Sequence, residues 1–489
     1  MFVRIDSLAI QGVETVPIGV EVNVASRGFP TFDIVGLATK AVSESKERVR
    51  AAIVNSGFTF PAKRITVNLS PADLPKEGTF NDLSIAVGIL AATGEINVSE
   101  KSLFFGELSL DGSLNATKGV FLAALHAQAL GYKRLYIPNK SVSELVVQPD
   151  GVSVFPAAYL TEVLDNLKGE GTKIMQKVRP SMTNNETDET DFDVKLENII
   201  GQYKAKRALE IAAAGRHNIL LHGPPGAGKT MLAKAFRSIL PPLTKEEFFE
   251  SARVYSAVGK LAENKELLSR SPPFRDPHHS CSFAGFVGGL QVGEISLAHN
   301  GVLFMDEFPE FSRQIIESLR QPLEEGSMRI SRKNFSATLP ARFLLVAAMN
   351  PCPCGYYGSD VKECVCFPYQ IRNYRNKISG PILDRIDLFV DVPAVKNSEL
   401  VGQKAAESEK SEDVRKRVVT AKERLMSSNI TLNDQGKRFL RSANAKLNLS
   451  ARSYFKVLEV SRTIAVLAGS DEILSKHIAE ALQYRGDLG

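Results

Sequence analysis

The chain carries the run Gly223-Pro224-Pro225-Gly226-Ala227-Gly228-Lys229-Thr230, which fits the phosphate-loop pattern at every defined position. The run lies between an apolar stretch at 218–221 and a helix-forming stretch at 231–236, so we expect strand, loop and helix in that order. The glycines let backbone N–H groups turn toward phosphate oxygens, and the helix N-terminus adds its positive dipole. We expect Lys229 to reach the outer phosphates and Thr230 to ligate Mg²⁺. The run therefore predicts a nucleoside triphosphate site.

A second element ends in two adjacent acids. The stretch 300–305 is an apolar strand pattern, and Asp306 and Glu307 follow it directly. Successive side chains on a strand point in opposite directions, so the two acids can do different work. We expect Asp306 to hold the Mg²⁺ and Glu307 to orient and polarise the attacking water.

A third apolar strand pattern, at 343–349, ends in Asn350. An amide at the carboxyl edge of a strand beside the phosphate site can hold the water or the γ-phosphate; a turn-forming asparagine before Pro351 is the alternative. The order of strand, phosphate loop, helix and further strands predicts a doubly wound α/β nucleotide domain.

Two arginines further along are candidate catalytic residues. Arg385 lies just before a last strand pattern, and Arg452 lies in the first turn of a predicted helix. A cation in that turn interacts unfavourably with the positive end of the helix dipole. The placement is explained if Arg452 binds a phosphate. A solvated arginine is the alternative.

Length and composition limit the class of protein to which this chain can belong. The 489 residues suggest about three domains. Charged residues make up 24% and apolar residues 44% of the chain, and the net charge of +5 permits a polyanionic partner. No apolar run is long enough to span a membrane, and the first residues lack the apolar character of a secretory signal, so we expect no membrane association and a cytoplasmic location.

Composition also places the domain boundaries. The stretch 168–194 is polar and acidic, which indicates a linker. The part before it mixes strand patterns (18–24, 64–69) with helical ones (40–56, 118–130), which predicts an α+β domain. After about residue 390 we expect helices only, at 411–428, 434–443, 450–468 and 470–484, with Ser470 capping the last. The predicted domains are 1–167, 195–390 and 391–489.

Four cysteines gather in the loop 350–367. They are Cys352, Cys354, Cys364 and Cys366. Four thiols in one short loop can bind Zn²⁺ tetrahedrally, although the spacing C-x-C is less diagnostic than C-x-x-C. Reduced structural or redox-sensitive thiols are the alternative.

Together these residues resemble the AAA+ ATPases: the phosphate loop, Asp306-Glu307, Asn350, Arg385 and Arg452 match Walker A, Walker B, sensor 1, arginine finger and sensor 2. More closely, the chain is similar to the ComM/YifB family of magnesium-chelatase-like ATPases. The stretches that carry this similarity are Pro71-Ala-Asp-Leu-Pro-Lys-Glu-Gly78, Arg275-Asp-Pro-His-His279, the run from Gly293 to Asp306 and Asn350-Pro-Cys-Pro-Cys-Gly355. The resemblance implies an α/β AAA+ core with a helical lid, and a homo-hexameric ring that uses ATP and Mg²⁺. It further implies binding to single-stranded and branched DNA and promotion of branch migration during natural transformation, with a RecA-type recombinase as a partner.

The N-terminal part resembles the proteolytic domain of Lon, with two departures. The stretch Lys76-Glu-Gly-Thr-Phe-Asn-Asp82 has no serine at the nucleophile position, and apolar Val120 and Phe121 stand about where the catalytic lysine would be. Lys118 lies nearby but has no nucleophile to activate. We therefore expect a catalytically dead domain that serves as a scaffold or as a platform for DNA or a partner.

Candidate DNA contacts follow from the same resemblance. Arg329, Arg332 and Lys333 look like the tip of a pore-lining hairpin, where their charges can follow phosphates without reading sequence. Arg275 and the pair His278-His279 lie in the insert between the Walker elements. No third metal ligand accompanies the histidines, so a structural role is favoured for them.

Two other function classes remain open. A chelatase motor would drive metal insertion into a porphyrin with partner subunits, but the fused N-terminal domain argues against it. An ATP-dependent protease would need the missing serine.

Overall fold

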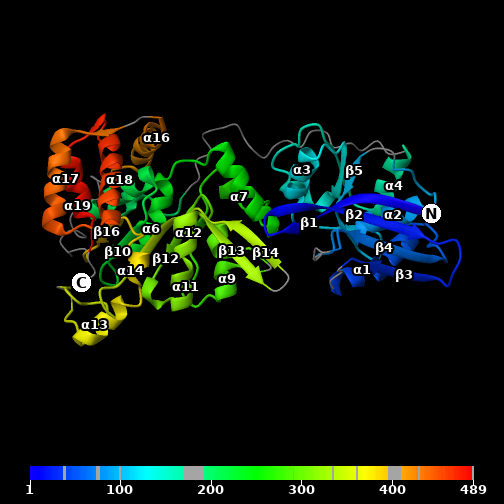
Figure 1. Cartoon of the computed structure of the whole chain (residues 1–489), viewed down its shortest axis with the longest axis horizontal. Coiled ribbons are helices and arrows are strands. Elements are labelled where there is room, and N and C mark those ends of the chain that lie inside the picture. Colours follow the sequence, from blue (N-terminus) through cyan, green and yellow to red (C-terminus); the bar gives the residue numbers. More distant parts are fainter. Residues whose placement is uncertain are drawn as a thin grey trace.

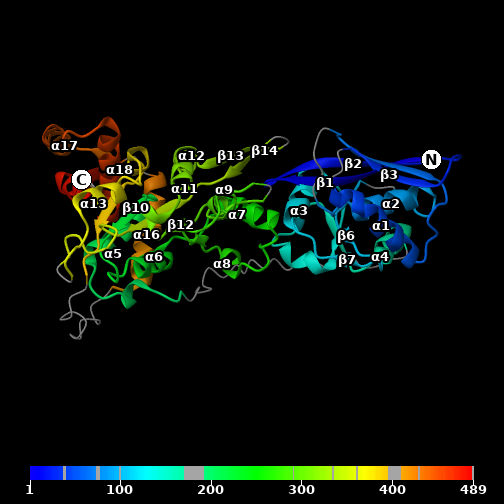
Figure 2. The same cartoon turned by 90° about the horizontal axis from the view of Figure 1, so that it is seen from below.

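The computed structural model describes residues 1–36, 40–72, 78–98, 101–169, 192–289, 291–332, 335–359, 362–394, 409–427 and 430–486, with the backbone alone at 40–43, 332 and 335. The molecule is elongated, with one sheet at the N-terminal end, a second sheet in the middle and a group of helices at the other end (Figure 1). A view turned by 90° shows the same order of the three parts along the long axis of the molecule (Figure 2). No helix within the described ranges is both long enough and apolar enough to cross a bilayer.

The N-terminal body is built on a seven-stranded mixed sheet with strand order β3-β4-β2-β1-β5-β8-β9. In β2, Val20 and Val22 are buried while Glu21 and Asn23 are not, because consecutive side chains point to opposite faces. Helix α2 is buried along nearly its whole length and packs on β1 and β2. The body thus mixes helices and strands, as expected.

The strands of this body are β1 (Phe2–Gln11), β2 (Glu14–Val24), β3 (Thr31–Val35), β4 (Arg64–Ser70), β5 (Ser102–Phe104), β6 (Glu107–Leu108), β7 (Leu114–Asn115), β8 (Arg134–Pro138) and β9 (Ser153–Ala157). Its helices are α1 (Lys40–Asn55), α2 (Asp82–Ala92), α3 (Val120–Ala129), the short 3₁₀ helix η1 (Asn139–Glu144) and α4 (Leu160–Lys168). Most of the predicted linker, residues 170–191, lies outside the described residues.

The middle body is a five-stranded sheet of order β11-β12-β15-β10-β16, in which every pairing is parallel. Along β10, Ile219 and Leu221 join the apolar core on one face, and Leu220 joins the core on the other. Both faces are covered by helices, which explains why the central strands are continuous apolar runs. The predicted α/β nucleotide fold is confirmed.

The strands of the middle body are β10 (Ile219–His222), β11 (Phe274–Arg275), β12 (Val302–Met305), β15 (Leu344–Met349) and β16 (Leu388–Asp391). The helices around them are η2 (Leu196–Asn198), α5 (Tyr203–Gly215), α6 (Lys229–Phe236), η3 (Arg237–Ile239), α7 (Lys245–Ala257), α8 (Lys265–Leu268), α9 (Phe283–Val287), α10 (Glu294–Leu297), η4 (Phe308–Glu310), α11 (Arg313–Ser318), α12 (Arg320–Glu325), α13 (Pro368–Arg375) and α14 (Gly380–Leu383).

The C-terminal body consists of α16 (Ser411–Ser427), α17 (Asp434–Leu447), α18 (Ala451–Leu467) and α19 (Ser475–Gln483). The expectation of helices only was wrong, because the two-residue strands β17 (Thr431–Leu432) and β18 (Glu472–Ile473) pair in parallel. Ser470 does not cap α19: its hydroxyl donates to the carbonyl oxygen of Glu472, and α19 begins after that strand. Helices α16 and α18 pack on α5 of the middle body.

A buried glutamate joins the N-terminal and middle bodies. Glu144 accepts hydrogen bonds from the backbone N–H groups of Gly119 and Val120, at 3.2 and 3.1 Å, where α3 begins. The same carboxylate oxygen accepts a bond from the hydroxyl of Ser256 in α7, at 3.1 Å. Burial raises the pKa of Glu144 to about 7. The carboxyl therefore links two bodies in a place where its charge is poorly solvated.

A hairpin projects from the middle body toward the N-terminal sheet (Figures 1 and 2). It consists of β13 (Ser327–Arg332) and β14 (Phe335–Pro340) in antiparallel register. The turn between β1 and β2 lies against it, because a β-carbon at Gly12 would be 2.7 Å from Leu339 Cδ2. The two bodies are thus in contact at the hairpin as well as at Glu144.

Candidate functional site

The phosphate-loop run connects β10 to α6 at the carboxyl edge of the parallel sheet. Gly226 and Gly228 have φ values of +77° and +91°, in the left-handed region that residues with side chains rarely adopt. A β-carbon at Gly223 would lie 2.1 Å from the carbonyl oxygen of Val392. Helix α6 begins directly at Lys229, so its free N–H groups belong to the same run.

The ammonium group of Lys229 is buried inside this loop. It donates hydrogen bonds to the carbonyl oxygens of Gly223 and Pro224, at 2.7 and 2.9 Å, and to Asn350 Oδ1 at 3.0 Å. Burial lowers the pKa of Lys229 to about 8, against the opposing effect of the nearby acids. The group is still mostly protonated at neutral pH, and phosphate oxygens can replace its present acceptors. The structure thus brings Asn350, at the end of β15, to the phosphate loop.

Thr230 and Asp306 meet at the same edge of the sheet. The Thr230 hydroxyl donates to Asp306 Oδ2 at 2.7 Å, and the other oxygen of Asp306 accepts from the backbone N–H of Glu307 at 2.9 Å. A hydroxyl and a carboxylate in contact supply the hard oxygen ligands that Mg²⁺ prefers. The two side chains therefore fit a Mg²⁺ ion bound beside the outer phosphates.

Glu307 follows β12 with a φ of +51°, an uncommon conformation for a residue with a long side chain. Its carboxylate is about half exposed, and Oε2 lies 3.4 Å from His279 Nδ1. The sequence favoured only a structural role for His278-His279. It did not indicate this contact, because the two helices α9 and α10 and the strand β12 separate the two residues in the chain.

The four cysteines of the loop 350–367 lie together. The sulfur of Cys352 is 3.3 Å from that of Cys354 and 3.7 Å from that of Cys364, and Cys354 and Cys364 are 3.6 Å apart. Tetrahedral zinc with Zn–S bonds of about 2.3 Å requires sulfurs about 3.8 Å apart. All four sulfurs lie within 4.8 Å of one another, and among the described residues no other group of three or more such ligands does. The cluster therefore has the dimensions of a zinc site.

Arg385 lies at the amino ends of the strands, opposite the end that carries the phosphate loop. Its carbonyl oxygen accepts a hydrogen bond from Asn218, the residue before β10, whereas the phosphate loop follows β10. Roughly 13 Å of strand separates the two edges, which is more than an arginine side chain spans. The guanidinium of Arg385 is only 9% exposed; it pairs with Glu324 and donates to the carbonyl oxygen of Pro381. The chain therefore does not bring Arg385 to its own phosphate loop.

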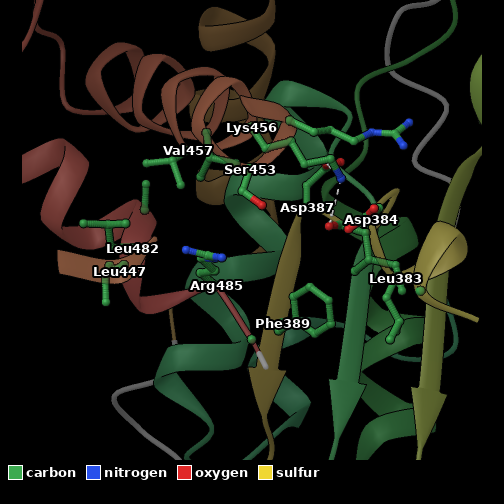
Figure 3. A pocket seen from close by; sticks show the side chains of 16 residues that line it. Leu383, Asp384, Asp387, Phe389, Leu447, Ser453, Lys456, Val457, Leu482 and Arg485 are labelled. Atoms are coloured by element: carbon green, nitrogen blue, oxygen red, sulfur yellow. Dashed lines mark hydrogen bonds and ion pairs between the residues drawn. The ribbon is translucent and has the colours of Figure 1, made fainter. Parts of the chain in front are cut away.

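Arg452 is at this second edge too. It lines a cavity of about 530 Å³ between the middle body and the helices, together with Asp384, Asp387, Lys456 and Arg485 (Figure 3). Lys456 forms an ion pair with Asp387 at 2.7 Å, directly before β16, which fastens α18 to the sheet. Figure 3 shows the Arg485 side chain pointing into this space from the last described residues.

Comparisons with known proteins show the family of the chain. Competence protein ComM of Haemophilus influenzae is 43% identical over 504 residues, which cover 98% of this chain and 96% of ComM. The chain belongs to the ComM/YifB family. The YifB protein of Escherichia coli is 40% identical over 497 residues, with 98% of this chain and 96% of YifB covered.

Three family models match the ComM/YifB-family chain in succession. They are described as "Subunit ChlI of Mg-chelatase" at 20–141, "Magnesium chelatase, subunit ChlI" at 195–400 and "Magnesium chelatase, subunit ChlI C-terminal" at 404–485. A more distant similarity, 27% over 205 residues, is to the DNA replication licensing factor Mcm2 of Drosophila melanogaster and covers 39% of this chain and 20% of Mcm2. The five-stranded sheet is therefore the core of an AAA+ ATPase.

The DNA-contact candidates of this ComM/YifB-family chain differ in their surroundings. Arg329 on β13 is 73% exposed and lies 3.9 Å from Glu325. The backbone of Arg332 ends β13, and Lys333 lies outside the described residues. Arg275 has a structural partner, because its guanidinium donates to both carboxylate oxygens of Glu294, at 2.6 and 2.8 Å. This pairing argues against a DNA contact for Arg275.

Proposed function

We propose that this protein is an ATP-driven hexameric ring motor that binds DNA and promotes branch migration. The observation that carries the proposal is the separation of the phosphate loop from Arg385 and Arg452. The side chains of Lys229, Thr230, Asp306 and Asn350 meet at the carboxyl ends of the strands, whereas the two arginines lie at the amino ends. A site divided in this way is complete only when the arginine edge of one subunit faces the phosphate loop of the next.

Within one chain, we propose that Lys229 and the loop N–H groups bind the phosphates and that Asn350 fixes the γ-phosphate or the water. Glu307 accepts the proton of the attacking water as the bond to the γ-phosphorus forms and the bond to the β–γ bridging oxygen breaks. Mg²⁺, held by Thr230 and Asp306, would neutralise charge on the phosphate oxygens.

Between chains, Arg385 and Arg452 would stabilise the charge that develops on the neighbour's γ-phosphate. Arg385 must first leave Glu324, because that carboxylate now occupies its guanidinium. Glu324 is largely exposed, but the Arg385 side chain is mostly buried, so Arg385 must also move outward to reach the neighbour's phosphate.

The DNA partner is proposed from the hairpin and from the relatives. Arg329 is exposed on β13, and its charge, with those of Arg332 and Lys333, can follow the backbone of a single or branched strand. One relative is named a competence protein and another a DNA replication licensing factor. On these names we propose that the motor acts in natural transformation and homologous recombination. The cytoplasmic location and a RecA-type recombinase as partner are proposed from the sequence and the family resemblance alone.

We propose that the N-terminal body is a Lon-like scaffold without protease activity. Phe80 is buried within the short stretch 78–82, and Val120 and Phe121 are buried in α3, where a Lon-type lysine would stand. Asp82 is buried and paired with Arg48 at 2.8 Å, which is a structural use of both charges. The described part of this stretch has no serine, the hydroxyl of Thr79 donates to the carboxylate of Glu107, and residues 73–77 lie outside the described part.

We further propose that Cys352, Cys354, Cys364 and Cys366 hold a structural Zn²⁺ ion. Their sulfurs have the required spacing, and backbone N–H groups of Cys354 and Tyr357 donate to the sulfurs of Cys366 and Cys352. Such bonds favour thiolates, the form in which cysteine binds metal.

A chelatase-like motor that remodels a protein partner is the second candidate, favoured by the three chelatase subunit models that match the chain. The DNA motor and the chelatase-like motor are distinguished by measuring ATP hydrolysis with a synthetic four-way DNA junction, with single-stranded DNA and with unfolded protein. Stimulation by DNA and ATP-dependent movement of the branch point support the DNA motor. A chain that hydrolyses ATP but neither binds nor moves the junction would exclude it.

A further inference from the structure

Two aromatic rings stand exposed where the cysteine-rich loop 350–367 passes into α13. Phe367 and Tyr369 are each 63% exposed, and Val365, two residues earlier, is 77% exposed. The ring centroids of Phe367 and Tyr369 lie 6.0 Å apart, and their planes differ by only 11°. Single exposed apolar side chains are common on protein surfaces, but a group of them indicates a surface that meets a partner.

The backbone that carries these rings is held on both sides. The N–H of Phe367 donates to Gln370 Oε1 at 2.9 Å, and its carbonyl oxygen accepts from the N–H of Gln370 at 2.9 Å. Ile371 and Tyr374 bury the inner face of α13. Cys366 of the cysteine cluster directly precedes Phe367. The rings are therefore placed in advance, and a ligand that stacks on them orders little additional chain.

Basic side chains accompany the rings. The described residues 362–377 hold four basic side chains and one acidic side chain, which are Lys362, Arg372, Arg375, Lys377 and Glu363. The charged groups of Lys362 and Arg375 each lie over a tyrosine ring of the loop, 5.2 and 5.5 Å from its centroid. Arg372 is exposed and follows Tyr369 by three residues, so both lie on the outer face of α13. The surface is therefore both aromatic and positively charged.

Single-stranded nucleic acid is the partner that this combination fits. Its unpaired bases stack on aromatic rings, and its phosphates pair with cations. A neighbouring subunit fits less well. In the proposed ring, the side that faces the phosphate loop carries the cavity with Arg452, which is lined by three basic and two acidic side chains. It offers no net negative charge to a basic surface.

We propose that Phe367 and Tyr369 form a stacking surface for unpaired bases of a DNA strand, with Lys362 and Arg372 binding its phosphates. Helix α13 projects beside the C-terminal helices, whereas the hairpin with Arg329 projects toward the N-terminal sheet, so the two surfaces are separate (Figures 1 and 2). The stacking surface recognises single strands without reading sequence, because every base has a π face and a duplex keeps its bases stacked inside. The choice of DNA as the nucleic acid rests on the proposed function.

The test removes the planar rings and keeps their apolar character, in the double variant Phe367→Leu with Tyr369→Leu. Fluorescence anisotropy gives Kd for three labelled probes of equal length, which are oligo(dT), an abasic strand and a duplex. The double variant should bind oligo(dT) roughly 10-fold or more weakly, because it loses the base stacking. Its Kd for the abasic strand and for the duplex should change by less than about twofold, because those probes offer no free base.

Two control variants accompany the double variant. The exchange of the two side chains, Phe367→Tyr with Tyr369→Phe, keeps both rings and should bind every probe like the unchanged protein. Tyr159→Ala removes an exposed ring from the N-terminal body and should also leave binding unchanged. Melting curves and the size of the oligomer show whether each variant is folded and assembled. If the double variant does not fold, Tyr369→Leu carries the same test with an expected loss of roughly fivefold.

Each outcome decides for or against the stacking surface. A folded double variant that binds oligo(dT) as tightly as the unchanged protein overturns it, and so does equal weakening with all three probes. Loss of the oligomer together with DNA binding would assign the rings to a subunit contact instead. If the unchanged protein binds no DNA probe, the proposed DNA motor fails as well, whereas binding that the double variant retains removes the stacking surface alone.

Discussion

Gly355 of the cysteine-rich loop lies directly against Pro225 of the phosphate loop. A β-carbon at Gly355 would be 2.7 Å from Pro225 Cδ, and the φ of Gly355 is +86°. The same loop begins at Asn350, whose amide contacts Lys229. The cysteine cluster therefore supports one wall of the ATP site.

Replacing Gly355 by alanine should weaken ATP binding. The substitution adds left-handed strain, on the order of 1 kcal/mol, and pushes the new methyl group against Pro225. Gly358→Ala is the matched control, because Gly358 also has a positive φ, +73°, but has open space around its missing side chain. Titration with ATP should show a larger Kd for Gly355→Ala only; equal effects of both variants would mean that strain alone matters.

Purified protein should contain about one zinc per chain, and replacing both Cys352 and Cys364 by serine should remove it. We expect a lower melting temperature and weaker ATP binding in that variant, because the loop loses its cross-link beside Pro225. Elemental analysis and melting curves measure this, with Cys281→Ser as a control outside the cluster. Zinc-free protein together with an unchanged melting curve for the double variant would leave the thiols without this role.

Glu307→Gln should bind ATP and keep the oligomer but hydrolyse slowly, because an amide cannot take the proton of the water. Lys229→Ala should lose ATP binding, because it removes the buried cation of the phosphate loop. Glu310→Gln is the control, since Glu310 pairs with Lys377 instead. Turnover close to normal in Glu307→Gln would show that another group activates water.

Arg385→Ala should bind ATP almost normally and hydrolyse it roughly 10³-fold more slowly. Mixing it with Lys229→Ala should restore part of the activity, because an intact phosphate loop can then face an intact arginine. Arg320→Ala, which removes an arginine paired with Glu317, is the control. The division of the site between subunits is wrong if exchanging subunits recover no activity at any ratio.

The junction at Glu144 should weaken as pH rises. Burial raises the pKa of Glu144 to about 7 in the folded chain, from an ordinary value of 4.5, so the folded chain keeps the proton to higher pH than the unfolded chain. The free energy of unfolding therefore falls between about pH 4.5 and 7. Glu144→Gln should remove this pH-dependent loss. Compared with the unchanged protein, the variant should therefore gain free energy of unfolding between pH 4 and pH 8. Melting curves across this range measure it, with exposed Glu14→Gln as the control; parallel curves for both variants would contradict the prediction.

Local patterns were enough to predict the elements that carry the ATP site. Apolar runs followed by a glycine loop, by Asp306 or by Asn350 place these residues at one sheet edge in any parallel α/β fold. The pairs His279–Glu307 and Glu324–Arg385 are different, because each depends on how distant segments pack and no spacing rule describes it. The two-residue strands β17 and β18 were missed since two residues carry no periodicity.

The contact between Gly12 and Leu339 has a mechanical consequence. A DNA strand pulled across Arg329 would load β13 and β14, and the base of that hairpin rests on the turn between β1 and β2. Part of any force on the DNA would pass into the N-terminal sheet, whose strands β1 and β2 are long and paired along their full length. The N-terminal body, which we propose to be a scaffold, would then be the stiff support against which the proposed motor pushes.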